Sequence, residues 1–550
     1  MRPALLSLLL LSCMDPGQSP PGVPSPAGYE PAPPSRVVLV DPQGGEIVSG
    51  TIEVRAAIES PESIEAVTIL VNGESIATLR AAPFAVEMDT TTLGDGIVDV
   101  RAVARWQDGT VERDAAAVRV DNHEPSVEIL EPSDGDFRFV EDAPFRFSVR
   151  AEDGSQLTHL LLLAGDEVVA DIAPLRTDHV VLVDPASLYP ADAVDAVHVT
   201  LQAEATDALG RVGTSSIAVN VRSRLAWRFD TLGRIETAPV VLPDGGVAVG
   251  SFDGRLYVVN SDGTERCRAE GGDEVVGAPA LSPDGTQIVW GTTRRLRAAD
   301  PATCAIRWTH ATEAIWRAGP TIAPDGTIYA ATFTGTLHAI SPAGATRWTF
   351  DLGGESIAPP TVAPDGTVLA GSFSGILHAI APDGTPRWQF ETGAEIGAPA
   401  LATDDAIYVG SYDFYLYALS HDGREIWEYP FATDADVQCA PDLLPRGDVA
   451  FCSRDGHVYA ARASDGSEKW RFETAGLTYG GVVVGKDGSV YAGAADGTLH
   501  ALGPDGSPRW SFETFEAIVA RPATGAGMVF VPSADRRLYA LWADGTPEGS

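Results

Sequence analysis

The feature that most limits what this chain can fold into is a tryptophan that recurs about every 40 residues through its C-terminal part. A period of this length, with four short strands in each unit, is the signature of a β-propeller. Successive repeat positions are 39 to 43 residues apart, and eight units fit between residue 223 and the C-terminus. The repeat positions are Trp227, Cys267, Trp308, Trp348, Trp388, Trp427, Trp470 and Trp510.

Each unit is predicted to contain four strands, as segment 381–419 illustrates. A short aromatic strand carries the tryptophan, and an Ala-Pro strand follows that usually ends at a Pro-Asp-Gly turn. A third strand comes next, and after a loop the fourth strand ends at an Asp-Gly turn such as Asp383-Gly384. Glycine supplies the positive φ that tight hairpin turns need. Because a blade cannot bury both of its faces alone, we expect each tryptophan to wedge against the neighbouring blade. Burying such a ring contributes at most about 4–6 kcal/mol.

The ends of the repeat array predict how the ring closes. The array begins with a tryptophan strand and ends after Leu538–Leu541, so the last unit lacks its outer strand. We expect residues 227–229 to supply that strand, which removes an exposed sheet edge.

Two segments match a known repeat closely: Ala299-Asp300-Pro301-Ala302-Thr303 up to Trp308, and Ala463-Ser464-Asp465-Gly466 up to Trp470. With the following Ala-Pro and Leu-Tyr-Ala-Leu strands, they resemble the PQQ-like repeat. That repeat occurs in quinoprotein alcohol dehydrogenases and in the outer-membrane barrel-assembly lipoprotein. The resemblance covers about residues 224–550 and implies an eight-bladed propeller. Since this fold hosts both enzymes and scaffolds, it does not assign an activity.

The N-terminus is predicted to be a targeting segment over residues 1–13. Arg2 precedes an apolar run, and Leu10-Leu11-Ser12-Cys13 resembles a lipobox with Cys13 as the lipidated residue. The run is too short to span a bilayer, whereas several acyl chains anchor a protein stably. An ordinary signal with an incidental cysteine is the alternative. Met14 after the cysteine favours the outer membrane, and the proline-rich residues 14–35 are expected to form an extended tether.

Two β-sandwiches are expected between the tether and the propeller, over residues 36–122 and 123–222. Short β-rich runs such as Thr51–Ile58 and Val98–Trp106 alternate with turns, which is typical of immunoglobulin-like folds. They resemble bacterial Ig-like modules of surface proteins, and the resemblance implies either a spacer or an adhesion role.

The charge balance excludes one class of partner. The 76 acidic residues outnumber 38 basic ones, which gives a formal net charge of −38. Such a surface repels phosphate backbones, so nucleic-acid binding is not expected, and solubility is the simplest role for the charge.

The four propeller cysteines are predicted to form two disulfides, since an exported domain with an even cysteine count favours them. Cys439 and Cys452 lie at matching distances from the Pro445 turn on predicted antiparallel strands. Cys267 and Cys304 then form the other pair, with one at a tryptophan position and the other at a turn glycine of the next blade.

No catalytic, cofactor-binding or metal-binding residues are predicted. The resembling dehydrogenases carry a vicinal cysteine pair and an Asn-containing calcium site, but here no two cysteines are adjacent and Asn260 is the propeller's single Asn. His338, His378 and His500 share one repeat position with Tyr257, Tyr417, Tyr459 and Tyr539, so we interpret them as structural. The Asp-Gly turns lack the spacing of a calcium-binding loop.

The best candidate for a binding surface is the propeller end where two sets of loops emerge together. One set is rich in acids: Glu236, Asp273, Glu274, Glu313, Glu355, Glu395, Asp434, Asp436 and Glu516. Aromatic and arginine residues are enriched at interface hot spots, although the aromatics could equally be blade packing. The binding-face candidates are Phe252, Phe333, Phe373, Tyr412, Phe414, Trp316, Arg454 and Arg536.

The sequence therefore predicts an all-β, exported, lipid-anchored protein whose propeller binds an envelope protein or a surface polymer and catalyses nothing. We expect a monomer that touches the membrane only through its lipid. Two alternatives stay open: a scaffold for outer-membrane protein assembly, and a PQQ-dependent oxidoreductase.

Overall fold

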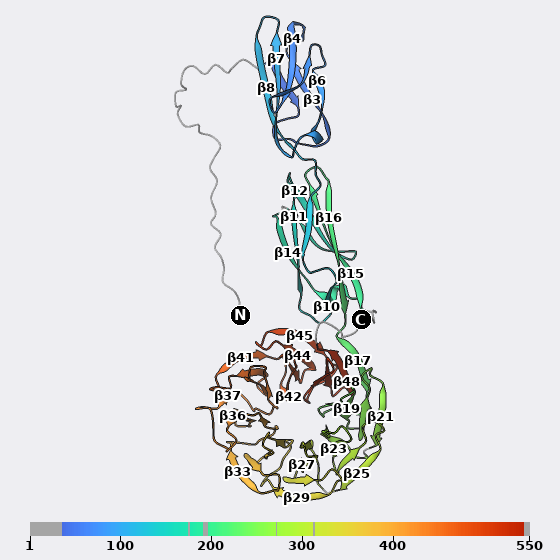
Figure 1. Cartoon of the computed structure of the whole chain (residues 1–550), viewed down its shortest axis with the longest axis vertical. Coiled ribbons are helices and arrows are strands. Elements are labelled where there is room, and N and C mark those ends of the chain that lie inside the picture. The colour runs from blue at the N-terminus through green and yellow to red at the C-terminus, as the bar shows by residue number, and fades with distance from the viewer. Residues whose placement is uncertain (1–35, 174–175, 191–195, 271, 312–313, 544–550) are drawn as a thin grey trace, which may run out of the picture. The chain divides into compact units, whose positions relative to one another are not determined.

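The computed structural model describes residues 36–550 except 174–175, 191–195, 271, 312–313 and 544–550 (Figure 1). Cys13, the tether and Glu313 therefore lie outside the described residues. The described chain forms strands and three short 3₁₀-helices, η1 (Pro61–Ser63), η2 (Thr90–Thr92) and η3 (Pro185–Leu188). None of these described residues belongs to a helix long and apolar enough to cross a membrane.

The chain divides into two compact units. The first holds the described residues up to 124 together with segments 153–156 and 207–211. The second holds residues 125–152, 157–206 and those from 212 onward.

The first sandwich has a three-stranded and a five-stranded sheet. Their orders are β1-β3-β6 and β2-β8-β7-β4-β5. In β7 inward and outward residues alternate, and Trp106 at its end lies in the core with Val54, Val67 and Val100. The strands are β1 (Val37–Asp41), β2 (Ile47–Val48), β3 (Thr51–Ile58), β4 (Ile64–Val71), β5 (Glu74–Leu79), β6 (Ala85–Asp89), β7 (Gly96–Trp106) and β8 (Val111–Val120).

The second sandwich repeats this arrangement strand for strand, with orders β9-β11-β14 and β10-β16-β15-β12-β13. Phe147, Leu160, Leu162 and Leu201 are fully buried in its core. The strands are β9 (Ser126–Glu131), β10 (Asp136–Phe139), β11 (Phe145–Glu152), β12 (Leu157–Ala164), β13 (Glu167–Ile172), β14 (Asp178–Val183), β15 (Val197–Asp207) and β16 (Val212–Arg222).

From residue 225 onward the described strands form eight four-stranded antiparallel sheets, called blades 1 to 8 in chain order. Blade 1 consists of β18 (Val240–Val241), β19 (Val247–Gly250), β20 (Arg255–Val259) and β21 (Glu265–Glu270), and blade 2 of β22 (Val275–Leu281), β23 (Ile288–Thr292), β24 (Arg295–Ala299) and β25 (Ile306–Ala311). Blade 3 consists of β26 (Thr321–Ile322), β27 (Ile328–Ala331), β28 (Thr336–Ile340) and β29 (Thr346–Asp351), and blade 4 of β30 (Thr361–Val362), β31 (Val368–Gly371), β32 (Ile376–Ile380) and β33 (Pro386–Glu391).

Blade 5 consists of β34 (Leu401–Ala402), β35 (Ile407–Gly410), β36 (Tyr415–Leu419) and β37 (Phe431–Ala432), and blade 6 of β38 (Asp442–Leu443), β39 (Val449–Ser453), β40 (His457–Ala461) and β41 (Glu468–Glu473). Blade 7 consists of β42 (Thr478–Val484), β43 (Val490–Ala494), β44 (Thr498–Leu502) and β45 (Pro508–Glu513), and blade 8 of β46 (Ala523–Gly525), β47 (Met528–Pro532), β48 (Arg537–Trp542) and β17 (Leu225–Asp230). Figure 1 shows the outermost strands, such as β33 and β45, at the rim of the ring.

The burial of the strands changes from the second strand of a blade to its rim, as expected for blades packed face to face in a ring. Second strands such as β27 and β31 are short apolar runs in which every residue is buried. They are covered on both faces because a neighbouring blade packs on each side. Rim strands such as β29 and β33 instead alternate between exposed and half-buried residues.

Blade 8 combines the two ends of the array. Its outermost strand, β17, pairs antiparallel with β48, so that Trp227 lies opposite Ala540 and Phe229 opposite Leu538. This pairing leaves β48 with a partner on both sides.

Each of six tryptophans reaches the turn between the third and fourth strands of the next blade. Trp388 is an example: its indole N–H donates to the carbonyl of His421, at 2.8 Å. The ring covers Gly423, where a Cβ would come within 2.7 Å of the indole. The other pairs are Trp227–Gly263, Trp308–Gly344, Trp348–Gly384, Trp427–Gly466 and Trp470–Gly506. These contacts connect consecutive blades, since each tryptophan lies at the rim of one blade, on its outermost strand or, for Trp427, just before it, and its glycine lies in a turn of the next blade.

A disulfide stands at the position where the array lacks a tryptophan. Cys267, at the missing tryptophan position of blade 1, is bonded to Cys304, in the equivalent turn of blade 2. Cys304 has a φ of 56°, where the equivalent turns have glycine with positive φ. A disulfide therefore joins blades 1 and 2 at the position where a tryptophan–glycine contact joins six other pairs of consecutive blades.

Trp510 has no glycine turn to cover, because β48 and β17 are not consecutive in the chain. Its ring lies instead under the guanidinium of Arg224, 4.4 Å from the ring centroid. Arg224 forms an ion pair with Asp142 at 2.5 Å, and Asp142 makes a β-bridge with Trp510. Burial lowers the pKa of Arg224, against the opposing effect of Asp142.

Candidate functional site

The two sets of loops named in the sequence analysis lie at one end of the propeller. In every blade, a backbone N–H in the loop between the second and third strands donates to a carbonyl in the loop before the innermost strand. We call this end the loop face. The donors are Phe252, Thr293, Phe333, Phe373, Tyr412, Arg454, Ala495 and Ala534, and the acceptors are Arg234, Glu274, Ile315, Glu355, Glu395, Asp436, Leu477 and Ala517.

One repeated hydrogen bond therefore places eight side chains at equivalent points of the loop face. Four of them are aromatic, one is Arg454, and the remaining three are small. The aromatic rings are half-buried, so each presents part of its surface to solvent. Blades 3 to 6 carry large side chains at four consecutive positions, which form an arc of the loop face.

Three of the four arc side chains make contacts on the loop face. The ring centroids of Phe373 and Tyr412 are 6.0 Å apart. Arg454 donates to Asp436 at 2.9 Å, and its guanidinium lies 5.4 Å from the ring centroid of Tyr479. These contacts limit the rotamers of the arc residues in the unbound protein, which reduces the entropy lost on binding a partner.

Two bulky residues occupy positions where other blades have glycine. Five equivalent loops place a glycine at φ between 77° and 91°: Gly254, Gly335, Gly375, Gly456 and Gly497. Blade 5 has Phe414 there, at φ 77°, and blade 8 has Arg536, at φ 75°. A side chain in the left-handed region costs about 1–2 kcal/mol, so the backbone at these two residues is locally strained.

Trp316 was predicted to lie on this surface, and that prediction is wrong. Its side chain is fully buried and packs with Val289, Leu296 and Ile328 between blades 2 and 3. The equivalent positions hold Ile235, Ile396 and Ile518, which are also fully buried. The position points into the inter-blade core, a direction that an isolated aromatic in a loop sequence does not reveal.

A polar network beneath the loop face was not predicted. The hydroxyls of Tyr257, Tyr417, Tyr459 and Tyr539 each donate to the aspartate four residues earlier, at 2.6–2.8 Å. Burial, followed by the aspartate, raises the pKa of Tyr257 and Tyr539 to about 12. The recurrence of Asp-x-x-x-Tyr in the sequence is the signal that could have revealed the network.

The three histidines at the same repeat position have a different environment. Burial lowers the pKa of His338 to about 4, with a further contribution from His310, and burial also lowers the pKa values of His378 and His500. His338 packs against Trp316, with 5.0 Å between ring centroids. These histidines lie in three separate blades, so they do not converge on one site.

The propeller is expected to lose stability as the pH falls from about 6.5 to 4. In this interval the unfolded His338 takes up a proton and the folded one does not, so the unfolded state is favoured. Urea midpoints at pH 7, 5.5 and 4.5 would test this. His338→Phe should make this loss of stability smaller, although His378 and His500 still contribute to it, whereas His421→Phe, at a surface turn, should leave it as in the parent protein. An unchanged slope in His338→Phe would contradict the assignment.

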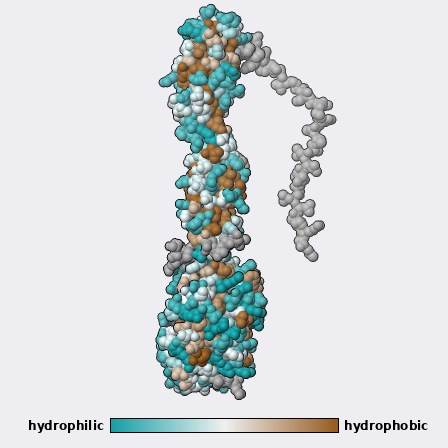
Figure 2. Space-filling view, turned by 90° about the vertical axis from the view of Figure 1, so that its right-hand side faces the viewer, coloured by the Kyte–Doolittle hydropathy of each residue, from teal (hydrophilic) through white to brown (hydrophobic). Residues whose placement is uncertain are grey.

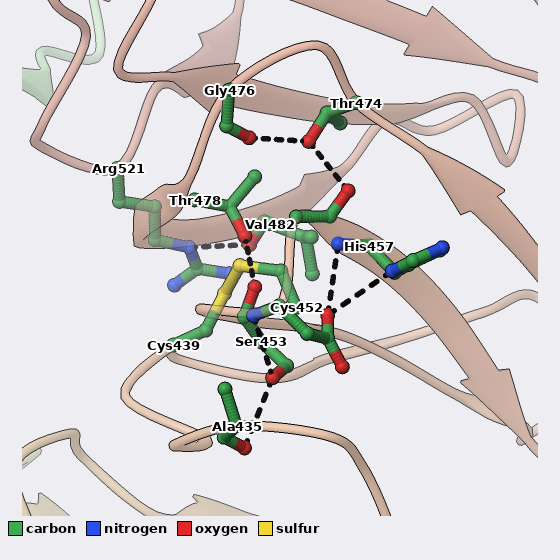
Figure 3. Close-up of a disulfide and its surroundings, with 12 residues drawn as sticks. Ala435, Cys439, Cys452, Ser453, His457, Thr474, Gly476, Thr478, Val482 and Arg521 are labelled. Carbon is green, nitrogen blue, oxygen red and sulfur yellow. Dashed lines mark hydrogen bonds and ion pairs between the residues drawn. A yellow bond between two sulfur atoms is a disulfide. The ribbon is translucent and has the colours of Figure 1, made fainter.

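The second disulfide lies within blade 6, where it joins the segment before the innermost strand to the second strand (Figure 3). Cys439 and Cys452 are bonded, with their Cα atoms 5.4 Å apart. The hydroxyl of Ser453, next to Cys452, donates to the carbonyl of Ala435 at 3.1 Å. Both loops of blade 6 are thereby fixed at their bases, which positions Arg454 and Asp436.

The acids of the loop face fall into two groups. Glu236, Asp273 and Asp436 pair with arginines within 3.2 Å. The others make no ion pair within the described part of the chain: Glu274, Glu355, Glu395, Asp434 and Glu516. The side of the propeller that faces the viewer in Figure 2 is mostly hydrophilic, with small, separate hydrophobic patches. The loop face therefore combines an aromatic arc with unpaired negative charge.

The residues do not fit a quinone site. The propeller cysteines are paired at two separate places, one joining the rims of blades 1 and 2 and one within blade 6. The amide of Asn260 lies in a β-turn, where it donates to Thr264 at 3.0 Å and accepts from Arg266 at 2.8 Å. No reaction step through a quinone follows from these residues.

Comparison with known proteins agrees with this architecture. Residues 292–440, 374–479 and 454–547 match the family model described as outer membrane protein assembly factor BamB, and residues 36–102 match a bacterial Ig domain. A search of curated proteins found no match to this sequence.

Two solved structures share the propeller fold. One is the crystal structure of BamB from Moraxella catarrhalis, with a TM-score of 0.51 and 23% identity over 59% of this chain and 99% of that chain. The other is the computationally designed Ika8 protein, with a TM-score of 0.50 and 16% identity over 57% of this chain and 98% of that chain. The blade geometry and these matches together identify the chain as a propeller of PQQ-like, BamB-like repeats preceded by a bacterial Ig-like domain.

Proposed function

We propose that this chain is an exported, non-catalytic lipoprotein of the cell envelope, anchored through Cys13, whose closed eight-bladed propeller binds a protein partner. The binding surface is the loop face, where Phe333, Phe373, Tyr412 and Arg454 form the arc. Phe414 extends this surface in blade 5, and Arg536 extends it in the equivalent loop of blade 8. Residues 36–122 and 123–222 act as Ig-like spacers. A surface polymer is the other class of ligand that this face suits.

The observation that carries the proposal is the pair of strained residues at glycine positions. Phe414 and Arg536 have φ values of 77° and 75° where five other blades have glycine. Packing does not explain Phe414, because 45% of its surface is exposed. A few residues contribute most of the energy at protein interfaces, and aromatic residues and arginine are enriched among them, so a binding role accounts for both substitutions.

A second candidate function is the assembly of outer-membrane proteins. The match to the family of outer membrane protein assembly factor BamB supports it, as does the BamB structure that covers 59% of this chain. In that role the partner is a component of the assembly machinery, and the same arc would contact it.

Site-specific photo-crosslinking in intact cells would test the proposal. A photoreactive phenylalanine analogue at Phe373 or Phe333 should capture a specific envelope protein. The same analogue at Asp383, in a turn at the opposite end of blade 4, should capture none. Equal adducts from both ends would contradict the proposal, and the mass-spectrometric identity of the adduct separates general partner binding from outer-membrane assembly.

Phe414→Gly is expected to weaken partner binding at least tenfold without destabilising the fold. Glycine adopts the positive φ of position 414 without side-chain strain, which should raise the free energy of unfolding by about 0.5–1 kcal/mol. The loss of the exposed ring from the interface should weaken binding. Binding of the crosslinked partner by titration calorimetry and urea unfolding would measure both effects. Tyr429→Ala, which removes an exposed ring from the rim of blade 5, should change neither.

A further inference from the structure

Three aspartates far apart in the sequence meet in the first compact unit. Asp121 follows β8, Asp153 belongs to segment 153–156, and Asp207 ends β15 within segment 207–211. One carboxylate oxygen of each lies within 4.8 Å of the other two. We call these residues the aspartate cluster.

Two oxygens of the cluster are buried without a hydrogen bond. Asp153 Oδ2 accepts from the backbone N–H and the hydroxyl of Ser155, at 2.9 and 2.5 Å, but its Oδ1 has no partner among the described residues. Asp121 is fully buried, and its Oδ2 also has none. A buried carboxylate oxygen without a partner is costly, so both oxygens indicate a missing ligand.

The charge of the cluster is only partly neutralised by protein groups. Arg211 Nη2 lies 2.9 Å from Asp121 Oδ1 and 2.7 Å from Asp207 Oδ2, but it makes no hydrogen bond of good geometry. Three carboxylates and one guanidinium leave a formal charge of −2. The side chains of Asp121 and Asp207 are both 0% exposed, so water screens the charges of these two carboxylates poorly.

We propose that the aspartate cluster binds one Ca²⁺ ion. Calcium takes oxygen ligands at about 2.3–2.6 Å in flexible geometry, so ligands on opposite sides of the ion are up to about 5 Å apart. The separations within the cluster fit this span, and a divalent cation balances the remaining charge. Magnesium suits the cluster less well, because it needs near-ideal octahedral geometry at about 2.1 Å. The sequence analysis predicted no metal site because the three aspartates form no local motif.

Calorimetric titration of the full-length, chelator-treated protein with CaCl₂ would test this site. We expect one ion per chain at saturation, and thermal unfolding of the first unit at a higher temperature in calcium than in EDTA. Asp153→Asn removes one ligand charge from a half-buried position and should weaken binding at least tenfold. Asp166→Asn, in an exposed turn, is the matched control and should bind as the parent protein does.

Arg211→Gln provides a second, independent readout. If the ion and Arg211 share the carboxylates, removing the guanidinium should raise the affinity for Ca²⁺ and make the thermal stability of this variant more dependent on calcium. The absence of saturable binding to the parent protein would overturn the proposal. A calcium response that Asp153→Asn leaves unchanged, or that MgCl₂ reproduces at equal ionic strength, would overturn it too, since both indicate general screening of an acidic surface.

Discussion

Replacing Trp388 by alanine is expected to lower the free energy of unfolding of the propeller by about 3 kcal/mol. Large-to-small changes of packed tryptophan cost about 3–5 kcal/mol, and the lower end applies because this ring is only half-buried. The variant also loses the indole hydrogen bond to His421 and uncovers Gly423 in the next blade. Chemical denaturation followed by far-ultraviolet circular dichroism would measure the change.

The matched control is Phe515→Ala, which removes an aromatic ring that is 75% exposed on the same propeller. Surface substitutions of this kind usually alter stability by no more than about 0.5 kcal/mol. Equal losses in the two variants would show that the tryptophan contacts do not hold consecutive blades together.

Breaking the disulfide between blades 1 and 2 is expected to cost about 3–4 kcal/mol. Cys267 and Cys304 are 37 residues apart, and closing a loop of that length removes a comparable entropy from the unfolded chain in the chain-entropy model. Cys267→Ala should show this loss in equilibrium unfolding. Mass spectrometry of the alkylated, non-reduced parent protein should find both pairs, Cys267–Cys304 and Cys439–Cys452, closed.

A double variant tests whether the disulfide replaces a tryptophan contact. Cys267→Trp with Cys304→Gly introduces the tryptophan–glycine pair that connects other consecutive blades, and glycine adopts the positive φ of position 304 without side-chain strain. We expect it to recover at least half of the stability that Cys267→Ala loses, and unfolding midpoints should show this. The control is the double variant Cys267→Ala with Cys304→Gly, which has the glycine but no tryptophan. If the tryptophan variant is no more stable than this control, the disulfide does not replace a tryptophan contact.

The propeller fold and its repeat were predictable because the signal is periodic. The tryptophan spacing and the Asp-Gly turns report a local geometry that every blade repeats, and the comparison with BamB repeats supports that interpretation. The pairing of Trp227 with Ala540 concerns residues at opposite ends of the array, yet the missing outer strand of the last unit indicated it.

Side-chain direction was harder to predict than strand order. Trp316 and Phe333 are both aromatics in or near loops, but Trp316 is fully buried and Phe333 is partly exposed. The difference depends on which way a short loop turns, and single-sequence patterns do not contain that information. The aspartate cluster escaped prediction for another reason, since proximity among residues 121, 153 and 207 arises only from tertiary packing.

The pairing of β17 with β48 also has a consequence during synthesis, because β17 is made long before its partner strand. Thr231, next to β17, bonds to Arg536, which is synthesised 305 residues later. At about 5–20 residues per second, the ribosome needs roughly 15–60 s to produce that partner. During this delay the early strand has an open edge that can recruit other chains. A polypeptide truncated before residue 537 lacks β48, so the edge of β17 stays unpaired. We therefore expect such truncated products to aggregate, because the ring closes only when β48 is present.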